Sequence, residues 1–305
     1  MRFNPAYKPR SLRWMPLLLL ICGLALGSGK SFAIESDMSV VPLRAKYTEL
    51  GKQLRNNQFQ RALYLSSAET SHDLKGEIYV VVDYPFATVN AALNNPAQWC
   101  EVLFLHMNVK YCHASNSKEG TALTVDLGRK YYQSLGDAYR LKFNYREVIT
   151  TPDYFALEFN AEDGPLSTRD YRIWIEATTI KDGRTFLHFT YAYAFGFAGR
   201  VGMSGYLSTI GRDKVGFTVT GKLPNGQPEY IQGVRGVVER NTMRYFLAID
   251  AYLAALTTAP KDQLEKRLHS WYNATDQYAL QLHEVERDDY LNMKRREHQR
   301  QQVVQ

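Results

Sequence analysis

Short segments of alternating apolar and polar residues, separated by turn signals, occupy the middle of this chain. The turns include Lys118-Glu-Gly, Thr151-Pro-Asp and Lys181-Asp-Gly. The segments predicted as strands are residues 110–114, 121–127, 138–150, 154–161, 170–180, 185–198, 206–210 and 215–220. Because consecutive strands joined by tight turns pair with their neighbours, the pattern predicts an antiparallel meander.

One face of this sheet is predicted to be apolar. In residues 138–150, Leu141, Phe143 and Tyr145 alternate with charged and amide side chains, so that one face is dry and the other is wet. The later strands continue the dry face with Phe155, Leu157, Phe159, Ile173, Ile175, Phe189, Tyr191 and Tyr193. Such a stripe suits the wall of a wide cavity and equally suits a solid core.

A long helix is predicted to cover the dry face. Its repeat of three and four residues consists of Ile231, Val234, Val238, Thr242, Tyr245, Ile249, Tyr252 and Leu256. Thr242 and Tyr245 place hydroxyl groups in the middle of this stripe. Buried polar atoms need hydrogen-bond partners. The hydroxyls could therefore face a ligand head group or water in a cavity, or they could be bonded internally in a plain core.

Further elements precede the meander. Residues 40–57 are predicted to form a helix that packs as a collar on the main domain. The apolar stripe of this helix is Leu43, Tyr47, Leu50 and Leu54. Residues 62–67 and 77–83 read as strands, and a short helix at 87–93 leads toward Trp99.

Pro260 ends the long helix, and a second C-terminal helix is expected at residues 264–285. Its stripe is Leu264, Leu268, Trp271, Thr275, Tyr278, Leu282 and Val285. The polar tail that starts at Lys294 is predicted to be frayed, with the run Lys294-Arg-Arg296 in solvent.

The N-terminus has the form of a signal peptide. Residues 1–14 are basic, an apolar run of about a dozen residues follows from Met15, and Ser31-Phe-Ala33 suits signal peptidase. We expect cleavage near Ala33 and a periplasmic or secreted mature protein. A lipid anchor at Cys22 is the less favoured alternative, because bulky Ile21 precedes this cysteine.

Cleavage would also change the charge. Five of the 37 lysine and arginine residues precede residue 34, which leaves 32 against 31 acidic residues. This balance does not favour nucleic acid as a partner. Cys100 and Cys112 remain, and we expect them to form a disulfide in an oxidising compartment, with two buried free thiols as the alternative.

With this order of elements, the chain resembles the START family, the lipid-transfer domains related to the steroidogenic acute regulatory protein. The resemblance rests on the helix into Trp99, the Ser167-Thr-Arg-Asp-Tyr171 strand start, the hairpin over residues 205–220 and the helix over 231–256. Two positions depart from the family pattern. Ile175 stands where many relatives carry a further arginine, and Glu101 is one place later than the acid that follows the family tryptophan.

The resemblance implies an α+β helix-grip fold, in which a curved antiparallel sheet wraps around a long C-terminal helix. Extra N- and C-terminal helices are expected here. We predict a signal peptide at 1–33, an N-terminal helical segment at 34–59, a START-like domain at 60–258, and a C-terminal helix with a polar tail at 259–305.

The resemblance further implies a tunnel that binds, and could transfer, one lipid, sterol or similar hydrophobic molecule. The residues expected to contact it are Trp99, Phe143, Tyr145, Leu157, Phe159, Arg169, Ile173, Ile175, Phe189, Tyr191, Tyr193, Val238, Thr242 and Tyr245. Arg169 could hold a head group, or it could form a salt bridge with Asp170 or Asp163.

Two other functions stay open. A cyclase- or aromatase-like enzyme would use Arg169, Glu158 or Tyr245 in the same cavity, and an interaction module would dock on an envelope protein through residues 264–285. No hydrolase, metalloprotease, nucleotide or complete dinucleotide motif occurs in the sequence. We expect no cofactor and no metal, and a surface role for His188. A binding protein with transient membrane contact is favoured over an enzyme.

Overall fold

The computed structural model of this protein describes residues 39–196 and 214–304. The predicted signal peptide and the predicted strand at 206–210 lie outside these residues. The described part combines a large antiparallel sheet with helices, so the predicted α+β class is confirmed. Within residues 39–196 and 214–304, no helix has both the length and the apolar character that a membrane span requires.

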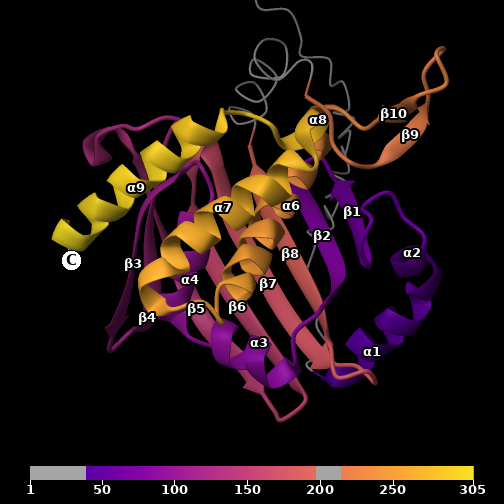
Figure 1. Ribbon diagram of the computed structural model, residues 1–305, viewed down its shortest axis with the longest axis horizontal. Coiled ribbons are helices and arrows are strands. Elements are labelled where there is room, and N and C mark those ends of the chain that lie inside the picture. Colours follow the sequence, from indigo (N-terminus) through magenta and orange to yellow (C-terminus); the bar gives the residue numbers. More distant parts are fainter. Residues whose placement is uncertain (1–38, 197–213, 305) are drawn as a thin grey trace, which may run out of the picture. The chain divides into compact units, whose positions relative to one another are not determined.

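Eight strands form the main sheet in the order β1-β2-β8-β7-β6-β5-β4-β3 (Figure 1). They are β1 (Leu63–Glu69), β2 (Asp73–Val82), β3 (Val109–Ser117), β4 (Gly120–Leu127), β5 (Tyr139–Thr150), β6 (Tyr154–Asp163), β7 (Thr168–Thr179) and β8 (Thr185–Phe195). From β3 to β8 each strand pairs with its neighbour in the chain, which confirms the meander. The turn between β7 and β8 uses Gly183 at φ +80°, a conformation that glycine adopts without strain.

The register places the predicted dry residues on one face. Leu157 lies opposite Ile175, and Ile175 lies opposite Phe189 on the next strand. All three belong to the main core, which lies between the sheet and the helices of its inner face. Side chains of opposite parity, such as Tyr154 and Trp174, form a second core on the outer face.

Helices α1 (Val40–Glu49) and α2 (Gly51–Arg55) cover part of the outer face. Leu43, Leu50 and Leu54 are buried in the second core, as the collar prediction requires. The predicted single helix is divided, because Leu50 leaves the helical conformation before Gly51.

On the inner face lie α3 (Phe86–Leu93), α4 (Pro96–Phe104) and the long α6 (Gly233–Ala254). α6 crosses β1, β2 and β8, and α7 (Gln263–Asp276) packs against α6 (Figure 1). The Trp271 indole of α7 donates a hydrogen bond to the Arg244 carbonyl of α6 at 3.2 Å. Because α6 is covered on both sides, it is buried almost all round rather than along one stripe.

The segment at 264–285 is not one helix, which corrects the prediction. α7 ends at Asp276 and a short α8 (Ala279–Leu282) follows. Leu268, Trp271 and Leu282 of the apolar stripe are buried within this chain. The stripe that was expected to dock on a partner therefore packs largely within this chain.

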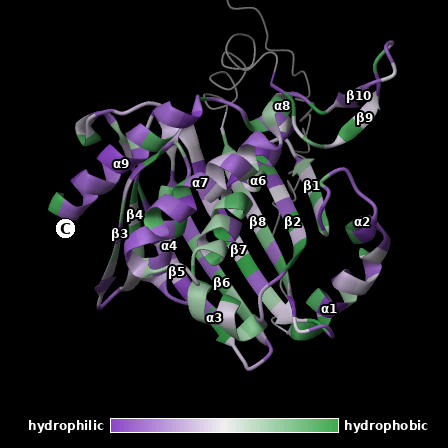
Figure 2. Ribbon diagram, viewed as in Figure 1, coloured by the Kyte–Doolittle hydropathy of each residue, from purple (hydrophilic) through white to green (hydrophobic). Residues whose placement is uncertain are grey.

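The C-terminal tail was predicted as frayed, and this is wrong. Residues Arg287–Val304 form α9, which is mostly hydrophilic in colour (Figure 2) and yet packs against β3. Lys294 is fully buried, and its Nζ donates to the Val109 carbonyl at 2.6 Å and to Glu297 at 3.0 Å. Burial lowers the pKa of Lys294 to about 8, against the opposing charge of Glu297. The sequence does not reveal that Glu297 also pairs with buried Lys110 of β3 at 3.0 Å.

Residues 215–220 were expected to belong to the main sheet, and this too is corrected. Among the described residues, β9 (Val219–Lys222) pairs with β10 (Pro228–Tyr230) in a two-stranded sheet separate from the main one. The turn between them contains Gly226 at φ +83°.

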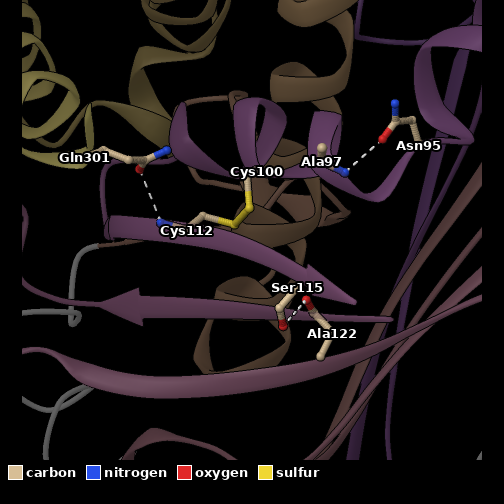
Figure 3. The surroundings of a disulfide bond; sticks show 7 residues. All are labelled: Asn95, Ala97, Cys100, Cys112, Ser115, Ala122 and Gln301. Carbon is tan, nitrogen blue, oxygen red and sulfur yellow. Dashed lines mark hydrogen bonds between the residues drawn. A yellow bond between two sulfur atoms is a disulfide. The ribbon is translucent and has the colours of Figure 1, made fainter. Parts of the chain in front are cut away.

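A disulfide links Cys100 of α4 to Cys112 of β3, which confirms the predicted pairing (Figure 3). The backbone N–H of Cys112 donates to Gln301 of α9 at 3.3 Å. Helices α4 and α9 and the edge strand β3 therefore meet at this bond.

Replacing both Cys100 and Cys112 with serine should lower the free energy of unfolding by about 3 kcal/mol. The two cysteines are 12 residues apart, and closing a loop of that size in the unfolded chain has about this effect. Urea unfolding of the oxidised protein measures the loss. Reduced wild type is the control, and it should match the variant. Equal stability of reduced and oxidised wild type would contradict the stabilising role.

Candidate ligand-binding site

A small apolar pocket lies between α4, α6 and the inner face of the sheet. Its lining residues are Trp99, Val102, Leu103, Phe143, Phe159, Ile173, Phe189, Tyr245 and Ile249. The free volume is about 10 Å³. One water molecule needs roughly 10–15 Å³ of such space, so the pocket is closed to anything larger.

Within residues 39–196 and 214–304 the predicted tunnel is not open, because large rings fill the interior. The Trp99 and Phe159 rings meet edge to face at 5.0 Å between centroids, and Tyr145 meets Phe159 at 5.2 Å. Tyr171 and Tyr193 stack at 5.3 Å farther along the sheet. The aromatic stripe therefore packs as core in this structure.

Six of the predicted contact residues line the pocket: Trp99, Phe143, Phe159, Ile173, Phe189 and Tyr245. Others belong to the surrounding core without lining it, namely Tyr145, Leu157, Ile175, Tyr191, Tyr193 and Val238. Val102 and Leu103 also line the pocket and were not among the predicted contact residues. Their spacing of three and four residues after Trp99 places them on the same helix face, which is a signal that could have found them.

The pocket wall offers few polar atoms. The Trp99 indole N–H already donates to the Leu93 carbonyl at 2.6 Å. Tyr245 contributes a hydroxyl, and burial raises the pKa of Tyr245, so that this group stays protonated. The wall therefore favours a neutral apolar occupant.

His106 stands behind Tyr245, and the sequence analysis gave it no role. Its ring stacks on Tyr245 at 4.8 Å, and its Nδ1 accepts from the Asn108 N–H at 3.2 Å. Burial, followed by the charge of Arg244, holds the pKa of His106 well below its usual value, so the ring is neutral. Because Nδ1 accepts a hydrogen bond, the proton of the neutral ring is on Nε2. Nε2 has no hydrogen-bond partner among the described residues.

Thr242 does not line the pocket, and its hydroxyl is bonded internally, the alternative that the sequence left open. Its hydroxyl donates to the Val238 carbonyl of its own helix at 2.7 Å. A Cβ built on Gly76 of β2 would lie 2.2 Å from this hydroxyl oxygen. A small side chain at position 242 is therefore explained by the close approach of α6 and β2.

Arg169 is not in the interior either. Its side chain is 50% exposed and pairs with Asp170 at 3.3 Å, the alternative that the sequence left open. The register shifts between Arg169 and Arg172, and Asp170 has φ 53°. This bulge interrupts the strand alternation and removes Arg169 from the inner face. Glu158, the other charged candidate for catalysis, pairs with Arg146 outside the pocket.

His188 was expected at the surface, and it is instead buried on the outer face. It stacks on Tyr79 at 4.0 Å, and its Nδ1 lies 2.8 Å from Glu176. Its Nε2 lies 3.0 Å from the Thr190 hydroxyl and 3.5 Å from Glu77. Burial alone would lower the pKa of His188, but the two carboxylates outweigh burial and raise it. His188 in turn helps to hold the pKa of Glu77 at about 2 although burial opposes this.

Within residues 39–196 and 214–304, no group of three or more histidine, cysteine, aspartate or glutamate side chains is placed to bind a metal. No protein-family model matches this chain, and no curated protein matches it.

Several solved structures are similar at low scores. Ara h 8.0201 has a TM-score of 0.33 and 10% identity, over 63% of this chain and 97% of that chain. Human StAR-related lipid transfer protein 5 has a TM-score of 0.30 and 8% identity, over 55% and 88%. The di-domain ARO/CYC BexL from the BE-7585A biosynthetic pathway has a TM-score of 0.30 and 13% identity, over 75% and 57%. Scores this low carry no argument about function. The helix-grip architecture follows from the strand order and from the place of α6.

Changing Gly76 to alanine should destabilise the protein by about 1–3 kcal/mol, the usual cost of overpacking. Thr242→Ala in the same chain should recover part of this loss, because it removes the nearest atom. Urea unfolding of the double-mutant cycle measures the coupling. Gly136→Ala is the matched control, since its Cβ would meet no atom closer than 3.6 Å. Strict additivity of the Gly76 and Thr242 changes would contradict the contact.

The charged pairing of His188 should make stability depend on pH. Because the folded pKa of His188 is raised, its contribution is fully present below the usual value of about 6.5 and is lost as pH rises through the folded value. We expect the urea midpoint to fall between pH 6 and pH 9 in wild type, and to fall less in His188→Gln. The control is His72→Gln at an exposed histidine. If both variants retain the wild-type slope, His188 is not the group responsible.

Proposed function

We propose that this protein binds a hydrophobic small molecule, such as a lipid or sterol, between the inner face of the sheet and α6, without changing it chemically. The main support for this proposal is the composition of the pocket wall. Its nine residues come from α4, α6 and four strands, and they are apolar or aromatic. An apolar ligand gains about 0.8 kcal/mol for each methylene that it buries in such surroundings.

Binding requires the pocket to expand, since ligand sites commonly measure about 300–1,000 Å³. The contacts of α6 differ along its length. Toward its N-terminus, Glu239 accepts hydrogen bonds from the Ser67 hydroxyl at 2.6 Å and the Phe217 N–H at 2.6 Å. Farther along, Tyr245 and Ile249 meet the pocket through apolar contacts, which have no fixed direction. A ligand can replace apolar contacts by similar ones, so expansion around Tyr245 and Ile249 costs less than displacement of the Glu239 hydrogen bonds.

The proposed compartment is the periplasm or the exterior. The leader-like residues 1–33 support this, and so does the Cys100–Cys112 bond, because disulfides persist in oxidising compartments. Delivery of a ligand at a membrane surface is compatible with the proposal.

An enzyme has less support. Arg169 and Glu158 lie outside the pocket, each in an ion pair. Tyr245 is the remaining candidate, and its raised pKa makes its hydroxyl a poor base near neutral pH.

Filling the pocket tests the proposal. Leu103→Trp should weaken binding of an apolar fluorescent probe such as a pyrene-labelled sterol by at least roughly tenfold, because the larger side chain takes the space of the ligand. Leu280→Trp makes the same change at a 63% exposed position and should bind like wild type. Circular dichroism checks that both variants fold. If Leu103→Trp does not fold, Val102→Phe replaces it in the experiment.

Native mass spectrometry of the protein purified from its host should also show an added mass that is lost on denaturation. Failure of wild type to bind any apolar probe, or equal binding by all variants, would reject the internal site and leave a solid core.

A further inference from the structure

A second and much larger hollow lies on the outer side of the sheet. It is bordered by α1, α2, the start of β1, the end of β2 and the turn between β7 and β8, and its volume is about 900 Å³. We call it the collar groove and define it by the lining residues Tyr47, Leu54, Arg55, Val81, Ile180 and Lys181. In contrast to the internal pocket, it is open enough to admit a ligand without rearrangement.

The floor of the collar groove is apolar. Leu54 of α2, Val81 of β2 and Ile180 after β7 line it, and all three belong to the second core. Tyr47 lies beside them and contacts Phe186 at 5.0 Å between ring centroids. Leu54, Val81 and Ile180 are each less than a tenth exposed. A hydrocarbon chain in the groove would cover the apolar surface that these side chains and Tyr47 still expose.

The rim of the groove is cationic. Arg44, Arg55, Lys181 and Arg184 line it, against one acidic residue, Asp182. Arg44 pairs with Asp153 at 2.7 Å, and Arg184 pairs with Asp83 and Asp182. Arg55 and Lys181 have no acidic partner among the described residues, so the rim keeps two uncompensated positive charges.

We propose that the collar groove binds an anionic amphiphile, with its hydrocarbon chain along Leu54, Val81 and Ile180 and its carboxylate or phosphate between Arg55 and Lys181. The charge complementarity selects an anion, and the apolar floor selects a chain rather than an inorganic ion. This site is separate from the internal pocket, whose wall carries no charge. The inference therefore does not depend on the proposed function.

Calorimetric titration with four twelve-carbon compounds, each below its micelle concentration, tests the site. Dodecanoate and dodecyl phosphate should bind, whereas dodecanol should bind more weakly and dodecyltrimethylammonium most weakly. Comparison of the first two compounds distinguishes a free fatty acid from a lipid phosphate as the preferred head group. Affinity for both anions should fall as salt concentration rises, because salt screens exposed charges.

The variant Arg55→Gln with Lys181→Gln should weaken binding of the anions roughly 3- to 10-fold, the loss expected for two exposed charge contacts. Its affinity for dodecyltrimethylammonium should not fall. Lys118→Gln with Lys261→Gln removes two exposed positive charges elsewhere and is the matched control. Both double variants change exposed side chains, so both should fold.

Leu103→Trp separates the two sites. It should leave dodecanoate binding unchanged if the anion occupies the collar groove. Loss of dodecanoate binding in this variant would move the ligand to the internal pocket and overturn the inference while supporting the proposed function. Absence of saturable binding, or equal affinities of the Arg55/Lys181 variant and its control, would also overturn it.

Discussion

The close contact between α6 and β2 is the constraint on which the inner architecture depends. Gly76 has no side chain, and Thr242 fits directly against it. One turn earlier, Glu239 receives hydrogen bonds from Ser67 on β1 and from the backbone of Phe217. These contacts fix one half of the helix at short range from the sheet. The rest of α6 then lies close to the aromatic rows of β5 to β8, and their rings close the interior.

The sequence predicted the sheet well because strand patterning is a local signal. Alternation at Leu141, Phe143 and Tyr145 identifies the inner face regardless of what covers it, and turn residues mark most of the strand ends. The disulfide could also be predicted, since Cys100 and Cys112 are the two cysteines that follow the expected signal peptide and an oxidising compartment was expected for them. The interior volume could not be predicted. It depends on the distance between α6 and β2, and no pattern within either segment reveals that Gly76 and Thr242 are opposite each other.

Charged residues account for several of the other errors. A lysine or histidine in sequence is assigned to solvent because burial of an unpaired charge is costly. Lys294 and His188 escape that cost through hydrogen-bonded partners. Lys294 bonds Glu297 one turn along α9 and the Val109 carbonyl, which is distant in the chain. His188 lies between Glu176 and Glu77. Arg169 is the converse error. Strict alternation along β7 predicts Arg169 on the inner face of the sheet, whereas a local bulge places it outside the interior.

The two faces of the sheet differ in chemistry because they differ in coverage. α4 and α6 cover the pocket region of the inner face, so an occupant there must displace protein contacts and cannot bring a charge with it. α1 and α2 cover only part of the outer face, and water reaches the collar groove beside Arg55 and Lys181. Placing a charged group at that rim costs little free energy, whereas placing it in the interior costs much more. Strands β7 and β8 take part in both sites. Ile173 of β7 and Phe189 of β8 line the closed apolar pocket, and the turn that joins the two strands borders the open cationic groove. Two ligand classes can thus be separated by one layer of backbone.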